Sequence, residues 1–207
     1  MAVRYPIVAY TYDQLNADAR PGNSSQPESI PYTFFDQQNF ATLWTNVNFF
    51  AAVPTDPTLG NIQQANTLSA EQYFRLFAIT LDWIISATSQ SSSGAPTIID
   101  DLLQIMNGSR ALVVVNIAMK QYVNTPIHNF HSSGGINVQY QLGTPTGSAL
   151  GNYAQNWYPD GGYNIGGAIV LPPKQTFQFS VQGVAAALVA TRAGRFTLHG
   201  VLSRPVR

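Results

Sequence analysis

Alternation of apolar and polar side chains in short segments is the feature that most constrains the fold of this chain. The segments Asn137 to Leu142 (NVQYQL) and Thr176 to Gln182 (TFQFSVQ) place apolar side chains at every second position, with amides or hydroxyls between them. Because successive side chains of a strand point to opposite faces, both segments are predicted to be strands with one buried face. Residues typical of turns separate such segments along the chain, as in all-β sandwiches and barrels.

Further strands are expected on both sides of these two. Near the C-terminus, Phe196, Leu198 and Leu202 share one face of a strand. Arg110 to Tyr122 (RALVVVNIAMKQY) is apolar on both faces in its first half and rich in β-branched residues, which predicts a central strand. The other expected elements are a helical turn leading into a long strand over Ser69 to Ser86, and strands near Ile7 to Tyr12, Tyr32 to Phe35 and Leu43 to Ala52.

One short helix is expected among the strands. Thr97 can cap a helix whose apolar residues follow helical spacing from Ile98 to Met106. Asp100 and Asp101 then fall in its first turn, where the helix dipole favours carboxylates. Adjacent helical residues point about 100° apart, so these two aspartates are not expected to form a catalytic pair.

The composition favours one folded domain with an uncharged polar surface. The chain has 207 residues, of which 45% are hydrophobic and only 10% are charged, whereas about 25% is usual for charged residues. Net charge therefore does not oppose assembled states. We expect an antiparallel β-sandwich domain at residues 69–207, and a loop-rich N-terminal segment at residues 1–68 that packs on the core or on neighbours.

The charged residues are unevenly distributed along the chain. No acidic residue follows Asp160, whereas several basic residues do, and these could face an anionic neighbour such as nucleic acid or lipid head groups. Alternatively, acidic residues of the same or an adjacent subunit neutralise them. Neither end carries an arginine-rich arm of the kind that holds a packaged genome. The candidate anion-facing residues are Lys174, Arg192, Arg195, Arg204 and Arg207.

Motifs for catalysis, metals and cofactors are weak. His128 and His131 have H-x-x-H spacing, and His199 could add a third ligand, but the glutamate and the helical spacing of zinc hydrolases are missing. The sequence contains no cysteine, no G-x-S-x-G turn and no phosphate-binding G-x-x-x-x-G-K-[ST] loop. We therefore expect no enzyme activity, no metal site, no cofactor and no small-molecule substrate.

A long segment from Gly143 to Asn164 combines aromatic side chains with glycines and amides. Such a combination can stack on a sugar ring or on a protein surface and then hydrogen-bond its edges. The alternative is that the rings fold back over the open end of the sandwich. The candidate residues for receptor or subunit contact are Tyr153, Trp157, Tyr158 and Tyr163.

The order of these elements resembles jelly-roll capsid and virion proteins of icosahedral, non-tailed bacterial viruses. The resemblance is carried by FRLFAITLDWII, TIIDDLLQIMNGS, RALVVVNIAMKQY, LPPKQTFQFSV and RFTLHGVLSR, and it covers roughly Ser69 to Arg204. It implies a mainly β sandwich of jelly-roll type, with two facing sheets, one or two short helices and many copies per virion. Shells of this kind that bind RNA carry a basic arm, and its absence here puts direct genome binding in doubt.

The resulting hypothesis is a structural subunit of a viral capsid, either a single jelly-roll capsid protein or a minor virion protein. It would be located in the virion and assemble by self-association with copies of itself and other virion proteins. Contact with an internal membrane or with the genome stays open. The alternative is a carbohydrate- or receptor-binding β-sandwich of a viral spike or fibre, and a hydrolase is the third interpretation.

Overall fold

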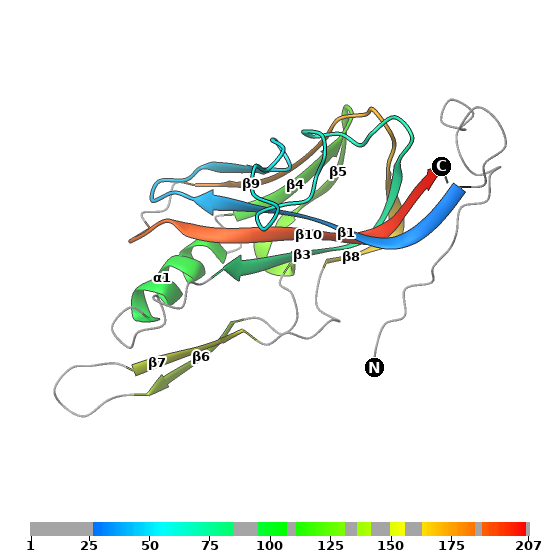
Figure 1. Cartoon of the computed structure of the whole chain (residues 1–207). Coiled ribbons are helices and arrows are strands. Elements are labelled where there is room, and N and C mark those ends of the chain that lie inside the picture. The colour runs from blue at the N-terminus through cyan, green and yellow to red at the C-terminus, as the bar shows by residue number, and fades with distance from the viewer. Residues whose placement is uncertain are drawn as a thin grey trace.

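Two four-stranded antiparallel sheets form the body of the protein (Figure 1). This computed structural model describes residues 27–84, 95–106, 111–130, 136–141, 150–155, 163–184 and 188–205. Sheet A has the strand order β1 (Pro27–Phe40), β10 (Arg192–Pro205), β3 (Tyr73–Ile84) and β8 (Tyr163–Leu171). Sheet B has the order β2 (Asn46–Phe49), β9 (Phe177–Gly183), β4 (Ala111–Ile117) and β5 (Lys120–Pro126).

A helix and a hairpin lie outside the two sheets (Figure 1). Helix α1 (Ala95–Met106) precedes β4, and a short 3-10 helix (Ile127–Phe130) follows β5. The hairpin consists of β6 (Ile136–Gln141) and β7 (Leu150–Gln155), which pair antiparallel with each other. The prediction of a mainly β, antiparallel sandwich with one or two short helices is thus confirmed.

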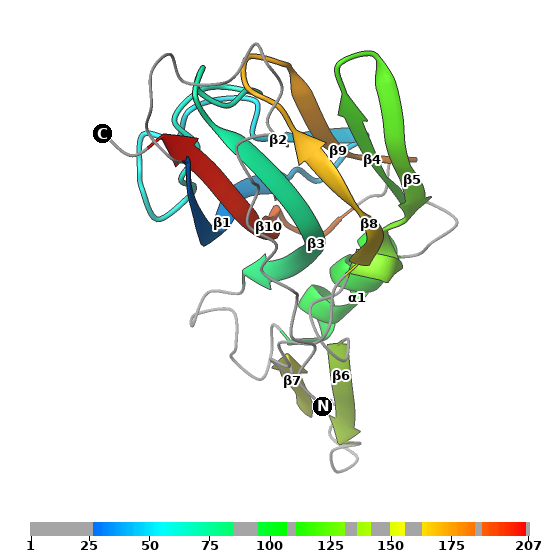
Figure 2. The same ribbon diagram turned by 90° about the vertical axis from the view of Figure 1, so that its right-hand side faces the viewer.

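Strands that are distant in the sequence pair with one another in a regular succession. β1 pairs with β10, β2 with β9, β3 with β8 and β4 with β5, each time antiparallel. Successive pairs alternate between sheet A and sheet B, so the chain crosses repeatedly from one sheet to the other (Figure 2). The crossings bring apolar side chains from most of the chain into the space between the sheets.

Phenylalanine rings fill much of that space. Phe49 of β2 and Phe196 of β10 meet across the two sheets with 4.5 Å between ring centroids, and Phe130 packs edge-on against Phe196 at 6.1 Å. Large aromatic side chains dominate core energetics because each buries 150–250 Å² or so. The phenylalanines that are almost fully buried are Phe40, Phe49, Phe50, Phe74, Phe130, Phe179 and Phe196.

Strand β9 follows the predicted alternation. Phe177, Phe179 and Val181 are buried and Gln178 and Gln182 are exposed, whereas Ser180, predicted to face outward, is also buried. In β10 the predicted inward residues are likewise buried, β3 lies within the segment predicted for it, and β6 overlaps its predicted segment but begins one residue earlier, at Ile136. Period-two patterning therefore located these strands correctly.

The segment predicted as one central strand over Arg110 to Tyr122 is instead a hairpin. β4 ends at Ile117, and β5 begins at Lys120. Ala118 in the connecting turn has a left-handed φ of 53°, and its N–H donates to the carbonyl oxygen of Thr176 at 2.7 Å. The prediction missed this turn because it holds no Gly, Asn or Pro, the residues that usually mark such a backbone. The central position of β4 in sheet B is nevertheless as expected.

Residues before the predicted domain boundary at residue 68 contribute strands to both sheets. β1 contains the strand predicted at Tyr32 to Phe35, and β2 lies inside the one predicted at Leu43 to Ala52. The strand predicted at Ile7 to Tyr12 lies outside the described residues. The loop-rich segment thus packs on the core of its own chain along the part that is described.

The loop after β2 covers the outer edge of β1. The N–H of Gln37 donates to the carbonyl of Leu59 at 2.8 Å, and the N–H of Asn61 donates to the carbonyl of Phe35 at 3.2 Å. The Asn61 side chain adds two further hydrogen bonds, accepting from the N–H of Phe35 and donating to the carbonyl of Thr33. Edge strands left open are sites of unwanted pairing, so this loop closes one edge of sheet A.

Phe77 interrupts the regular register of sheet A. On β10, Gly200 lies opposite Leu76 and His199 lies opposite Ala78, so Phe77 is the extra residue of a β-bulge. Gly200 is required at this position because a Cβ there would overlap the carbonyl oxygen of Arg75 and lie 2.6 Å from the Phe74 ring. The bulge switches which residues of β3 face the core, from Phe74 and Leu76 before it to Ile79 and Leu81 after it.

We expect the substitution Gly200→Ala to lower the free energy of unfolding by about 3 kcal/mol, because the added methyl group overpacks a site bounded by backbone. Urea denaturation followed by far-ultraviolet circular dichroism measures this loss. Thr197→Ala on the same strand, at a half-buried outward position, is the control and should lose far less. Equal losses for the two variants would contradict the close-approach argument.

Candidate functional site

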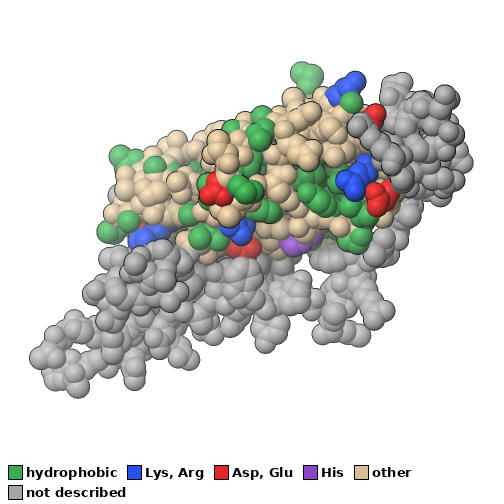
Figure 3. Space-filling model, viewed as in Figure 1, with side chains coloured by type: hydrophobic (Ala, Val, Ile, Leu, Met, Phe, Trp, Pro, Cys, Tyr) green, Lys and Arg blue, Asp and Glu red, His purple; other side chains and the backbone are tan. Residues whose placement is uncertain are grey.

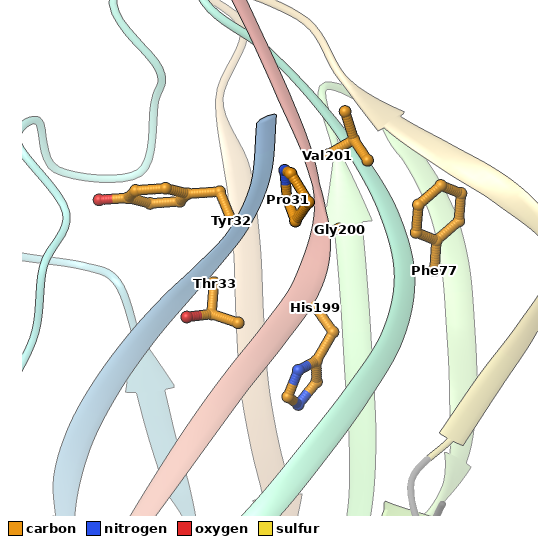
Figure 4. A pocket seen from close by; sticks show the side chains of 7 residues that line it. All are labelled: Pro31, Tyr32, Thr33, Phe77, His199, Gly200 and Val201. Carbon is orange, nitrogen blue, oxygen red and sulfur yellow. The ribbon is translucent and has the colours of Figure 1, made fainter. Parts of the chain in front are cut away.

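A shallow pocket of about 390 Å³ lies where β1, β10 and β3 run side by side, next to the bulge (Figure 4). Its lining is mainly apolar, with a histidine and a threonine hydroxyl at one end. The pocket forms at this place because the bulge interrupts the regular packing of side chains on the sheet. The lining residues are Pro31, Tyr32, Thr33, Phe77, His199, Gly200 and Val201.

His199 belongs to a small polar cluster beside this pocket. Its Nε2 lies 3.1 Å from the hydroxyl of Thr80, and the carboxylate of Asp82 acts on it electrostatically. Burial lowers the pKa of His199, and the negative charge of Asp82 opposes this effect without cancelling it. The imidazole is therefore held in its neutral form more strongly than a free histidine.

A hydroxyl, an imidazole and a carboxylate could in principle form a nucleophilic site. Thr80 and Asp82 are each only 7% exposed, so a substrate cannot reach the hydroxyl in this conformation. The cluster acts as a hydrogen-bonded structural element on the outer face of sheet A. The expectation that the protein is not an enzyme stays a prediction.

Of the three histidines considered as metal ligands, the two that the structure describes, His128 and His199, lie in different elements. His128 is exposed on the 3-10 helix, His199 lies in β10, and His131 lies outside the described residues. In the described parts of the chain, no group of three His, Cys, Asp or Glu side chains is placed to hold a metal ion.

Arg192 links the middle of helix α1 to the start of β10. The carboxylate of Asp101 is fully buried, accepts hydrogen bonds from Arg192 Nε at 2.7 Å and from the N–H of Val189 at 2.7 Å, and forms an ion pair with the guanidinium. The helix begins at Ala95, so Asp101 is not in the first turn, and the prediction that the helix dipole explains this residue is wrong. A buried carboxylate requires such a partner.

The other candidate anion-facing residues have different surroundings. Arg204 Nε lies 3.2 Å from Glu28 in an exposed ion pair. Arg195 donates to the Gln37 side chain at 3.0 Å and to the Thr58 carbonyl at 3.1 Å. Lys174 is exposed, and Arg207 lies outside the described residues. Acidic or polar groups of the same chain thus engage Arg192, Arg195 and Arg204.

The aromatic residues considered for receptor or subunit contact are only partly described. Tyr163 stacks on Phe130 with 4.6 Å between ring centroids and packs against the core. Tyr153 lies in β7 opposite Val138, with its side chain outside the description. Trp157 and Tyr158 lie outside the described residues. For Tyr163, the alternative that the ring folds back onto the sandwich agrees with the structure.

The outer face of sheet B was not predicted from the sequence, which indicated only that the polar residues between Thr176 and Gln182 point outward. Cross-strand register places Asn48, Ser180, Val114 and Asn124 in one row across all four strands. Rows on either side add further amides, and every amide of the face is exposed except the half-buried Asn116. We call this surface the amide face. Its amide side chains are those of Asn46, Asn48, Gln178, Gln182, Asn116, Gln121 and Asn124.

The amide face is free of ionisable side chains in the rows that define it. Leu112 and Pro126 are its other members at the surface, and Val114 and Ser180 of the central row are buried. Gln178 Nε2 donates to Asn48 Oδ1 at 3.1 Å, which links two adjacent strands. The sequence signal for this face is that outward positions of several separate strands hold amide side chains. These amides form one surface only when the strands are placed side by side.

Comparison with known protein families finds no family model that matches this chain, and comparison with curated proteins finds no significant relative. Among the helices in the described part of the chain, none has the length and apolar character needed to cross a membrane.

We expect Asp101→Asn to lower the free energy of unfolding by about 3 kcal/mol, because it leaves the guanidinium of Arg192 without a counter-charge in a buried site. Urea unfolding at neutral pH measures the effect. Glu28→Gln, which breaks the exposed pair with Arg204, is the matched control and should cost less than about 1 kcal/mol. A loss for Asp101→Asn as small as that of the control would contradict a structural role of the buried pair.

We also expect the stability of the protein to fall as the pH falls below the ordinary histidine value. The unfolded chain takes up a proton at His199 near pH 6.5, whereas the folded chain does so only at lower pH, so stability is fully present above 6.5 and is lost toward the lowered folded pKa. Urea midpoints between about pH 7.5 and 5.5 should decline less in His199→Gln than in the natural protein. His128→Gln controls for removal of an imidazole, and equal declines in all three proteins would refute this linkage.

Proposed function

We propose that this protein is a structural subunit of a viral capsid, either a single jelly-roll capsid protein or a minor virion protein, that assembles by self-association. The pairing of strands is the observation that carries the proposal. Among the strands of the two sheets, the first pairs with the last, the second with the second to last, the third with the sixth and the fourth with the fifth. This connectivity is that of a long antiparallel ribbon of paired strands, rolled up so that successive pairs alternate between two sheets. The strand pairing therefore supports a jelly roll.

The surface supports assembly in a second way. In the view of Figure 3, charged side chains are few and are separated by uncharged surface. Charged residues are depleted in the centre of protein interfaces, because their desolvation is costly. A chain with only 10% charged residues and zero formal net charge can bring copies together without strong repulsion.

The partners that fit this surface are copies of the protein and other virion proteins, and the virion is the proposed location. The ion pairs of Arg192 and Arg204 within the chain reduce the positive charge available to a nucleic acid. Contact with a membrane or a genome therefore stays a prediction without support from the described residues.

A carbohydrate- or receptor-binding head of a spike or fibre is the alternative. That function requires exposed aromatic rings, and of the candidate rings the one that is described, Tyr163, packs on Phe130. The described part of the chain thus favours the shell subunit over the spike head.

We expect the purified protein to form large assemblies whose mass rises with concentration. Sedimentation velocity and light scattering measure this mass, and negative-stain electron microscopy shows whether the assemblies are closed shells. Interfaces of about 800 Å² or more per partner are needed for stable contacts. A protein that stays monomeric at high concentration, or a stable trimer that binds a glycan array, would overturn the proposal.

A further inference from the structure

We infer that the amide face of one copy packs against the amide face of a second copy across a two-fold axis. This inference rests on the proposed function, since it names the surface by which copies of the chain associate. It follows from three properties of the described residues. The edge strands β1 and β5 resist strand addition, the rows of the amide face are uncharged and self-complementary, and the outer face of sheet A carries charged side chains.

One edge strand of each sheet, β1 in sheet A and β5 in sheet B, hinders pairing between copies. The loop containing Leu59 and Asn61 already pairs with the outer edge of β1. On the edge strand β5, Tyr122 is the extra residue of a bulge, and the ammonium of Lys120 lies 5.0 Å from the centre of its ring. Bulges and edge lysines are devices that prevent edge-to-edge association. Contacts between copies through these two edges are therefore disfavoured.

The amide face can pair with itself. Each amide side chain carries both a donor and an acceptor, so identical amides from two copies can hydrogen-bond in either direction. Identical surfaces meet in a two-fold dimer, and a surface that carries like charges would repel itself in that arrangement. The rows of the amide face hold the exposed Leu112 among the amides and no charged residue, and the nearby Lys120 ammonium lies over the Tyr122 ring of the edge strand β5, so this cost is small.

The outer face of sheet A lacks these properties. Arg75 and Arg195 lie on it, and the bulge at Phe77 and the neighbouring pocket make it uneven. The copies would have to desolvate guanidinium groups to meet there. The outer face of sheet B, whose rows carry no charged residue, is therefore the better self-contact.

A polysaccharide is the other occupant that an amide surface could attract, but sugar sites use exposed aromatic rings as platforms. Among the described strands of sheet B, the exposed aromatic residue is Tyr122 of β5, and the Lys120 ammonium lies over its ring. The observations thus favour a second copy.

Charge placed on the amide face tests this inference. The double variant Gln178→Glu, Gln182→Glu puts like charges on both copies at exposed positions of β9, and we expect the dissociation constant of self-association to rise about tenfold or more at low salt. The matched control is Gln63→Glu, Gln64→Glu, which adds the same charge at exposed positions of the loop beside β1 and should stay within about twofold of the natural protein. Sedimentation equilibrium measures the constants, and thermal melting verifies that both variants fold.

Charge complementation makes the test specific for contact between two amide faces. The variant Gln178→Lys, Gln182→Lys should also associate weakly alone, whereas an equimolar mixture of the glutamate and lysine variants should associate at least as strongly as the natural protein at low salt. A mixture that associates no better than either variant alone would mean that the two amide faces do not meet.

The outcomes separate this inference from the proposed function. If the natural protein assembles and the face variants assemble equally well, the amide-face contact is wrong and the shell subunit stands. If the natural protein stays monomeric, both fail. If it stays monomeric and binds glycans through a surface that the Gln178 and Gln182 variants destroy, the amide face is a sugar site instead.

Discussion

Burial of the inner faces of sheet A and sheet B against each other is the interaction on which the rest of the structure depends. The contact between Phe49 and Phe196 crosses from one sheet to the other, and Phe130 extends it to the 3-10 helix after β5. Successive pairs of strands belong to different sheets. Each pair can therefore bury its apolar face against the other sheet only after the chain has crossed from one sheet to the other. The core therefore forms from contacts that are distant in sequence, and its stability and the topology depend on each other.

The polar features of the sandwich follow from the same packing. Two carboxylates hold connecting segments by accepting hydrogen bonds from backbone N–H groups. Asp36 accepts from the N–H of Phe50 at 2.6 Å, where the backbone is left-handed. Asp101 accepts from the N–H of Val189 at 2.7 Å. Burial raises the pKa of Asp36 although its hydrogen bonds oppose this. The buried carboxylates of Asp36 and Asp101, which could be mistaken for catalytic groups, thus serve to hold connecting segments in place.

Period-two alternation in the sequence predicted the positions of strands. It could not predict features that depend on contacts between segments distant in the sequence. The strands around Phe179 and Phe196 were located because apolar residues occupy every second position. The turn at Ala118 was missed because an alanine carries no turn signal, and the partner of Asp101 was missed because Arg192 is far away in sequence. The amide face was missed for a similar reason, since neighbouring strands such as β2 and β9 are separated by most of the chain.

Strand β9 shows why the core and the amide face cannot be separated. Its inward residues Phe177 and Phe179 fill the core, and its outward residues Gln178 and Gln182 lie on the amide face. A register slip of one residue would exchange the two sets, exposing phenylalanine and burying amides. Both ends of the strand are fixed against such a slip, because the N–H of Phe177 donates to the Asn66 carbonyl and the N–H of Gly183 donates to the Thr45 carbonyl, each at 2.8 Å. The register that folds the chain is therefore also the one that builds its neutral surface.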